Sequence, residues 1–364
     1  MIKRIFTAID LPLLVIVLAI SAIGLCTVYS ATLDSATRLT SQMQNMGIAI
    51  LLMWMFALIP PQRWMQLSIF FYLIGIALLL AVFFGGVTVN GAKRWLSLGF
   101  TRIQPSEMLK IVTPMTLAWF FHQVQADRNW RHFVVAFIIL AIPFFLIAKQ
   151  PDLGTALLVG ACGFFVIFLA GLPWKIIISA VVLGGAAAPF LWHLLHDYQK
   201  KRILTLLDPT NDPLGAGYHI IQSTIAIGSG GKLGKGFLKG TQTHLEFIPE
   251  KHTDFIFAVF SEEWGLMGNV CLLFLYFLLI SRGLIIAYRA QHVFSRLLAG
   301  AITLGFFIYA FINMGMVSGI LPVVGVPLPF MSYGGTALLT LFGCIGLLMS
   351  INAQTRQTTK NTFS

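Results

Sequence analysis

The sequence predicts an all-α polytopic membrane protein with ten transmembrane helices and a large extracytoplasmic loop between helices 7 and 8. Two observations predict this class. The 364 residues are 57% hydrophobic and only 10% charged, whereas soluble domains carry about 25% charged residues. Long apolar stretches, most of them near the length of about 20 residues that crosses the hydrocarbon core, recur from one end of the chain to the other.

The predicted spans are apolar runs separated by more polar connections. The first run is too long for the apolar region of a signal peptide and has no small-residue cleavage site after it, so it is predicted to stay in the protein. The whole chain, 1–364, is predicted to form one transmembrane domain with its extracytoplasmic loop at about 195–253. The spans cover residues 11–30, 45–60, 67–85, 107–123, 132–148, 153–170, 174–194, 255–281, 296–318 and 332–352.

Basic residues predict the orientation of these spans. Lys and Arg concentrate in short cytoplasmic loops, whereas long loops cross the membrane largely regardless of charge. With both termini in the cytoplasm, the short outer connections contain only Arg38 and Lys149, and ten further cations lie in two longer outer segments, 86–106 and 195–253. We therefore expect a protein of the cytoplasmic (inner) membrane with both termini inside. The two basic outer segments need a separate explanation.

The net charge and the cysteine and histidine spacings exclude several functions. The net charge of +11 favours contact with anionic membrane lipids; no nucleic-acid partner is predicted, because the cations do not cluster in a soluble domain. No CxxC or HExxH pattern is present, so the sequence predicts no protein metal site. All four cysteines lie inside apolar runs: Cys26, Cys162, Cys271 and Cys344.

The large loop contains two recognisable segments. In residues 195–207, apolar side chains recur at near-helical spacing opposite Lys200, Lys201 and Arg202, which predicts a helix in the membrane interface. The following stretch GSGGKLGKGFLKG, residues 228–240, matches neither GxxxxGK[ST] nor GxGxxG. Two interpretations stay open for it: a flexible basic loop that closes on an anion, or an ordinary solvated loop.

Charged residues at the mouth of the fourth span are costly in a membrane and usually serve function. Glu107 and Lys110 are three residues apart and share a helix face. Two interpretations are open. Either the two charges only neutralise each other at the start of the helix near Pro105, or the glutamate holds the lysine so that it faces an anionic substrate. Three more cations precede this pair in the same outer segment, so the four together predict a diphosphate site: Lys93, Arg94, Arg102 and Lys110.

Two further acids lie at the starts of spans. Asp152 follows Lys149 at the start of the sixth span, where it suits either a helix N-terminal cap or a binding role. Asp254 precedes the apolar run of the eighth span. It either caps that helix or begins a groove, because Ala258, Ser261, Gly265 and Gly268 would share its face within about 80°.

A tight helix–helix contact would produce the same stripe of small residues. Glu262 and Glu263 lie deeper in the same span. We expect both to be buried, hydrogen-bonded or protonated groups that tie helices together.

Five stretches of the sequence, taken in order, resemble the SEDS family (shape, elongation, division and sporulation proteins). The stretch VVGVPLPFMSYGG is more similar to the rod-shape branch of this family than to its division branch. The five stretches are NGAKRWLSLGFTRIQPSEMLK (90–110), KQPDLGTA (149–156), DPLGAGYHIIQSTIAIGSGG (212–231), FIPEKHTDFIFAVFSEEWG (247–265) and LPVVGVPLPFMSYGG (321–335).

The resemblance implies a peptidoglycan glycosyltransferase that polymerises lipid II at the outer face of the cytoplasmic membrane during cell elongation. It also implies a class B penicillin-binding protein, a PBP2-type transpeptidase, as partner, together with the elongation machinery. Asp254 matches the presumed catalytic residue of the family. The family's important charged residues match Arg102, Glu107, Lys110 and Asp152, and Gln222 and Lys232, within or beside the third stretch, are further substrate-binding candidates.

This chemistry agrees with the residues. Glycosyl transfer needs a base for the acceptor hydroxyl and positive charge for the leaving diphosphate. Asp254 would be the base, and attack opposite the leaving group would invert the anomeric centre. Apolar neighbours would raise the pKa of Asp254 and Lys251 would lower it, so the net direction stays open. No cofactor is assigned, and a divalent cation, Mg²⁺ or Mn²⁺, stays open.

Two other classes of function were considered. A lipid II flippase would also use many spans, intramembrane acids and a groove, but the polar residues lie almost wholly on the outer side. A scaffold that only recruits the penicillin-binding protein would leave the clustered cations and Asp254 without a role.

Overall fold

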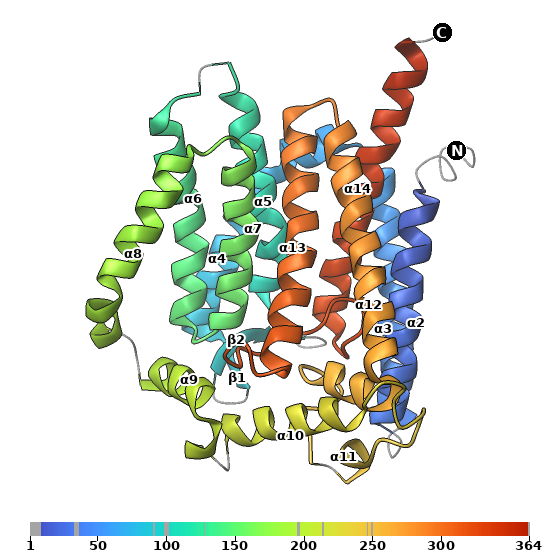
Figure 1. Ribbon diagram of the computed structural model, residues 1–364. Helices are drawn as coiled ribbons and strands as arrows, with labels where there is room; N and C mark the ends of the chain where they lie inside the picture. Colours follow the sequence, from blue (N-terminus) through green and yellow to red (C-terminus); the bar gives the residue numbers. More distant parts are fainter. Residues whose placement is uncertain are drawn as a thin grey trace.

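The computed structural model describes residues 9–32, 36–89, 92–97, 102–126, 128–194, 197–212, 215–245, 247–248 and 250–362. A bundle of long helices carries a small sheet and several short helices at one end, and the start of α2 and the end of α14 lie at the other end (Figure 1). The long helices are α2 (Leu11–Ala31), α3 (Ala36–Leu58), α4 (Pro61–Gly85), α5 (Pro105–Gln123), α6 (Trp130–Lys149), α7 (Leu153–Leu169), α8 (Trp174–Leu194), α12 (Ile256–Arg289), α13 (Val293–Val317) and α14 (Gly335–Thr362).

The all-α membrane class is confirmed. Within the described residues, seven helices are long and apolar enough to cross a membrane, and α7 and α8 are apolar but contain shorter apolar stretches. The number of spans stays a prediction. The seven are α2, α3, α4, α6, α12, α13 and α14.

α5 carries a buried acid and a buried base and is enclosed by protein. It packs against α4, α6, α7 and α13, and Glu107 and Lys110 are both buried in its first two turns. Charged side chains in membrane proteins face the bundle interior rather than lipid. The central position of α5 therefore lets the chain carry an ion pair where hydrocarbon would not accept one.

A three-stranded antiparallel sheet, in the order β1-β2-β3, fills part of the connection between α4 and α5. It was not predicted from the sequence, which marked this segment only as a basic loop. Val87 pairs with Trp95, and Ser97 pairs with Arg102. The strands are β1 (Val87–Val89), β2 (Ala92–Ser97) and β3 (Arg102–Ile103).

The segment between α8 and α12 forms short helices below the bundle in Figure 1. The predicted helix over 195–207 is confirmed as α9, and its contact with the membrane interface stays a prediction. The short helices are α9 (Asp197–Leu207), the 3₁₀ turn η1 (Pro209–Asn211), α10 (Ala216–Ser229) and α11 (Thr241–His244).

α12 is broken at Gly265, which has φ 63° and ψ −159°. The prediction of one continuous stripe from Asp254 to Gly268 is therefore wrong, since residues 256–264 and 266–289 form two helical parts. Asp254 also lies outside the helix, because Phe255 occupies the cap position and no side chain caps it. The break coincides with insertion of the glycine-rich loop, which supplies the backbone partners that the helix loses.

Asp10 joins three helices at the end where α2 begins. Its side chain is fully buried, caps α2 by accepting from the Leu13 N–H at 3.0 Å, and accepts two hydrogen bonds from Arg282 of α12, at 3.0 and 2.5 Å. Asn352 of α14 also donates to it, and Arg356 lies 3.5 Å away. This carboxylate is therefore fully enclosed by donors.

Replacing Asp10 by alanine is expected to lower the thermal unfolding temperature strongly, because it leaves the Arg282 guanidinium without its charge partner. Removing one member of a buried ion pair typically costs about 3–5 kcal/mol. The matched control is Arg356→Ala, which removes the more distant and half-exposed partner and should cost about 0–1 kcal/mol. A thermal-shift assay in detergent compares them, and equal shifts would contradict this account of Asp10.

Candidate active site

A cavity of about 220 Å³, lined by charged and apolar side chains, lies at the end of the bundle where α5, α7, α12 and α14 begin. Side chains from four separate parts of the chain line it, so its composition depends on the tertiary fold. Five of the predicted site residues lie in its wall: Arg94, Glu107, Lys110, Asp152 and Asp254.

Glu107 and Lys110 form a close ion pair in this wall. The Lys110 Nζ lies 2.5 Å from Glu107 Oε1, and the two side chains are 4% and 11% exposed. The same ammonium lies 5.3 Å from the centre of the Tyr309 ring. Glu107 Oε2 is buried and has no hydrogen-bond partner among the described residues. The ion pair between the two side chains is thus present, and one oxygen of Glu107 has no partner among the described residues.

Asp152 combines the two roles that its sequence position suggested. It is the N-cap of α7 and accepts from the Thr155 N–H at 3.2 Å, and Gln104 donates to its other oxygen at 2.9 Å. Arg94, on β2, lies 3.7 Å from Asp152 Oδ1 and also donates to the Pro151 carbonyl. Asp152 therefore orients both the start of α7 and a guanidinium in the cavity wall.

Asp254 is held through its backbone, and its carboxylate is left open to the cavity. Its carbonyl accepts from Asn313 Nδ2 at 2.8 Å, and the Thr253 carbonyl accepts from Ser332 Oγ at 2.7 Å. No hydrogen bond or ion pair reaches the carboxylate from the part of the chain that the structure describes. The capping interpretation of Asp254 is therefore not supported.

The pKa of Asp254 is raised from 3.8 to about 6, first by burial and then by the nearby Glu250 carboxylate. The sequence left this direction open because Lys251 could have lowered the pKa. In the structure, Lys251 Nζ donates to the Thr243 carbonyl at 3.0 Å. A carboxyl group with a pKa near neutrality can both accept and release a proton under ordinary conditions.

The end of α13 and the loop between α13 and α14 contribute site residues that were not predicted from the sequence. Asn313 donates to both the Asp254 and the Val326 carbonyls. Gly325 has φ 72°, and a Cβ there would lie 3.4 Å from Asp254 Oδ2. The available signals were the single amide within the apolar ninth span and the proline-rich run before the tenth span.

Three predicted residues do not line the cavity. The Lys93 ammonium donates to the Phe83 and Phe84 carbonyls, at 2.9 and 3.4 Å, because the C-terminal carbonyls of a helix attract a cation. Gln222 lies on α10, and Lys232 is exposed in the glycine-rich loop. The side chain of Arg102 lies outside the described residues. Roles for these four in substrate binding stay predictions.

The fold and the cavity together define a multi-pass membrane protein in which one cavity is lined by two paired cations and by a carboxylate that is unpaired within the described residues. Such a site can remove a proton from a hydroxyl group and hold an anionic group nearby. The family model described as "Cell cycle protein", FtsW/RodA/SpoVE, matches residues 5–357. The chain therefore belongs to the FtsW/RodA/SpoVE family, as the SEDS resemblance implied.

Known relatives and solved structures are similar along almost the whole chain. "Peptidoglycan glycosyltransferase MrdB" of Escherichia coli (strain K12) is 48% identical over 97% of this chain and 95% of its own length. "Probable peptidoglycan glycosyltransferase FtsW" of Geobacter metallireducens is 36% identical over 96% of each chain.

Two solved structures share the fold. A chain from a structure described as "Structural coordination of polymerization and crosslinking by a peptidoglycan synthase complex" has a TM-score of 0.83 and 32% identity, covering 96% of this chain and 98% of that one. The crystal structure of "Rod shape determining protein RodA" from Thermus thermophilus has a TM-score of 0.72 and 27% identity, covering 94% and 96%.

Replacing Asp254 by asparagine is expected to stabilise the protein at neutral pH. Because the folded-state pKa, about 6, lies above the ordinary value of 3.8, ionisation of Asp254 lowers stability as pH rises through about 6. The gain in unfolding temperature should therefore be present at about pH 7.5 and disappear near about pH 4. Thermal-shift curves measure it, with Asp197→Asn on exposed α9 as control. A gain independent of pH would contradict the raised pKa.

Proposed function

We propose that this chain is a peptidoglycan glycosyltransferase that polymerises lipid II at the outer face of the inner membrane during cell elongation. The observation that carries the proposal is the unpaired carboxylate of Asp254, which lines one cavity with Arg94 and Lys110. The names of the relatives from E. coli and G. metallireducens support the same activity. Residues of this cavity can therefore serve both parts of the transfer reaction. Asp254 can accept the proton of the acceptor hydroxyl, and the cations can stabilise the leaving diphosphate.

The proposed arrangement in the membrane is a single domain with ten spans and both termini in the cytoplasm. It is supported by the common end at which α2 begins and α14 ends, opposite the end where α9–α11 lie (Figure 1). The cavity is lined by the starts of α5 and α7. The loop 195–253 would then be extracytoplasmic. A lipid-linked sugar in the outer leaflet would reach Asp254 without crossing the membrane.

In the proposed reaction, Asp254 takes the proton of the 4-hydroxyl of an N-acetylglucosamine acceptor. The acceptor oxygen forms a bond to the anomeric carbon of the donor, and the bond from this carbon to the diphosphate oxygen breaks. The undecaprenyl diphosphate leaves with the bonding electrons. Attack from the face opposite the leaving group inverts the anomeric centre, as for hydrolases that use one carboxylate as base.

The charge balance of the cavity sets a condition on diphosphate binding. Two cations, Arg94 and Lys110, face three carboxylates among the lining residues, and each cation already contacts one of them. Further positive charge is needed, for which Arg102 or a divalent cation is available. Among the described residues no group of three His, Cys, Asp or Glu side chains could hold a metal ion. Mg²⁺ would share its coordination between one or two carboxylates and substrate phosphate oxygens.

The proposed partner is a class B penicillin-binding protein of the PBP2 type, acting with the elongation machinery. One structural neighbour belongs to a peptidoglycan synthase complex that coordinates polymerization and crosslinking. The alternative function is a lipid II flippase. Against it, the five charged residues of the cavity lie at one end of the bundle, whereas transport needs access from both sides. Transbilayer movement of lipid II by the purified chain, without polymer, would favour the flippase.

Asp254→Asn in the purified complex with its penicillin-binding protein is expected to abolish glycan polymer from lipid II, because the amide cannot accept the hydroxyl proton. Removal of a general base typically costs about 10²–10⁴-fold. Gel analysis of the glycan products measures the loss. Asp197→Asn makes the same chemical change on α9 and should polymerise normally. Normal polymer from Asp254→Asn would remove Asp254 from the base role.

The rate of polymerisation is expected to fall as pH drops through about 6, where Asp254 becomes protonated. Glu250→Gln removes the like charge that helps to raise this pKa, so the midpoint of the pH profile should move to lower pH. Initial rates at saturating lipid II between about pH 5 and pH 8 measure both profiles. An unchanged midpoint in Glu250→Gln, or a rate independent of pH, would contradict this assignment.

A further inference from the structure

The glycine-rich loop is inserted into the break of α12. In a continuous helix the Leu266 and Met267 N–H groups would donate to the carbonyls four residues earlier. Here they donate to the loop, to Gly231 O at 2.9 Å and Lys232 O at 3.1 Å. The carbonyls of Glu262 and Glu263 accept instead from Lys235 N and Gly236 N, each at 3.0 Å. Four backbone hydrogen bonds to the loop therefore replace two hydrogen bonds of a continuous helix.

Glycine is required where the two backbones touch. A Cβ at Gly234 would lie 2.0 Å from the Glu263 carbonyl oxygen, and one at Gly230 would lie 2.1 Å from the Ser261 carbonyl oxygen. On the other side, a Cβ at Gly265 would lie 2.3 Å from Gly234 N. These contacts explain the glycines at positions 230, 234 and 265. The loop is held against α12 here, so the expectation of a flexible anion-binding loop is not supported.

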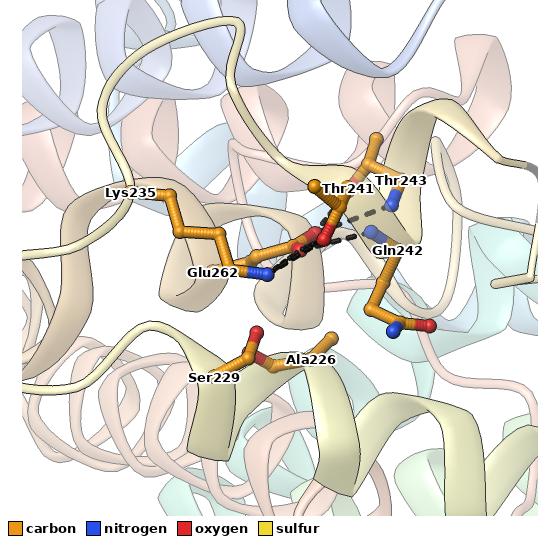
Figure 2. Close-up of polar contacts among 7 residues, drawn as sticks. All are labelled: Ala226, Ser229, Lys235, Thr241, Gln242, Thr243 and Glu262. Carbon is orange, nitrogen blue, oxygen red and sulfur yellow. Dashed lines mark hydrogen bonds and ion pairs between the residues drawn. The ribbon is translucent and has the colours of Figure 1, made fainter.

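Glu262 fastens the loop through its side chain, as Figure 2 shows. This fully buried carboxylate lies 2.7 Å from Lys235 Nζ. It also accepts from the N–H groups of Gln242 at 2.9 Å and Thr243 at 3.2 Å, and from Thr243 Oγ1 at 2.9 Å. The prediction that Glu262 is a buried, hydrogen-bonded support is confirmed.

Glu263 continues this attachment on the opposite face. It accepts from the Leu238 N–H at 3.2 Å and from Ser30 Oγ of α2. The two acids thus join the loop, α2 and the end of helical part 256–264 into one unit. We call residues 230–243 the inserted loop.

The helical part 256–264 connects the inserted loop to Asp254. It is a short segment of about 13 Å at 1.5 Å per residue, and residues 256–263 are all buried. The inserted loop fixes its far end. Asn313 and Ser332 hold the carbonyls of Asp254 and Thr253 at its near end. Because the helix is interrupted at Gly265, hydrogen bonds from the loop stand where this segment would otherwise be bonded to the rest of α12.

We propose that Glu262 and Lys235 are positioning residues for Asp254, acting through the inserted loop and helical part 256–264. This inference rests on the proposed function, since Asp254 is its reacting group. Their ion pair and the bonds around it set the tilt of the segment that precedes the break. A displacement of about 1 Å at a reacting group can cost about 10²-fold in rate, so loss of this attachment reduces turnover without removing any group that touches substrate.

The test uses Lys235→Met and Glu262→Gln in the full chain with its penicillin-binding partner. Both variants should lower kcat for lipid II polymerisation by at least about tenfold while KM changes by less than about twofold, because binding groups in the cavity are intact. Hydrogen exchange at the Leu266 and Met267 amides should become faster in both. Lys235→Arg keeps the positive charge that pairs with Glu262, so its kcat should be close to that of the wild type. Lys239→Met, an exposed lysine of the same loop, is the matched control and should behave as wild type.

Several results would overturn the inference: wild-type kcat in Lys235→Met, lower kcat with unchanged exchange at Leu266 and Met267, or an equal loss in Lys239→Met. If Glu262→Gln fails to fold, Lys235→Met and Lys235→Arg still decide the outcome. Failure of the proposed function is distinguishable, because the wild-type complex would then make no polymer. The exchange measurement would still report whether Lys235 holds the loop in the break.

Discussion

Polar groups inside the bundle need partners within the protein, because the hydrocarbon core of a membrane offers no hydrogen bonds. Most of the structure follows from this constraint. α5 carries Glu107 and Lys110 and is therefore surrounded by other helices. Asp10 is enclosed by arginine and asparagine donors at one end of the bundle, and Glu262 by donors of the inserted loop at the other. At the break in α12, the backbone groups that lose their helical partners form hydrogen bonds with backbone groups of the inserted loop.

Asp254 departs from this rule, and the departure coincides with the proposed chemistry. Its carbonyl is firmly held by Asn313, whereas its carboxylate has no partner among the described residues and carries a raised pKa. Natural proteins tolerate such locally unfavourable groups at functional sites because the surrounding structure enforces them. The neighbouring cations, Arg94 and Lys110, are already paired with carboxylates of their own. The free carboxylate therefore keeps its affinity for a proton.

The sequence predicted the membrane class, the approximate positions of most long helices and five residues that the fold brings into one cavity. These predictions succeeded because the length of an apolar run and a charged residue at its edge can both be read from a short stretch of sequence. The break at Gly265 was missed because its cause is a loop that approaches from outside the helix. The sheet after α4 and the contact of Lys93 with helix carbonyls were missed for a similar reason, since short strands and side-chain directions depend on tertiary neighbours. Asn313 acts through a backbone carbonyl 59 positions away in sequence, which periodicity alone does not reveal.

The interruption of α12 also has a consequence for how the protein is made. The inserted loop precedes α12 in the chain, so it emerges from the ribosome first and cannot occupy its final place until residues 256–267 have been synthesised. Until then the loop groups that bond α12 have no partners there. The inserted loop can consequently fix the segment after Asp254 only once the chain has been synthesised past the break at Gly265.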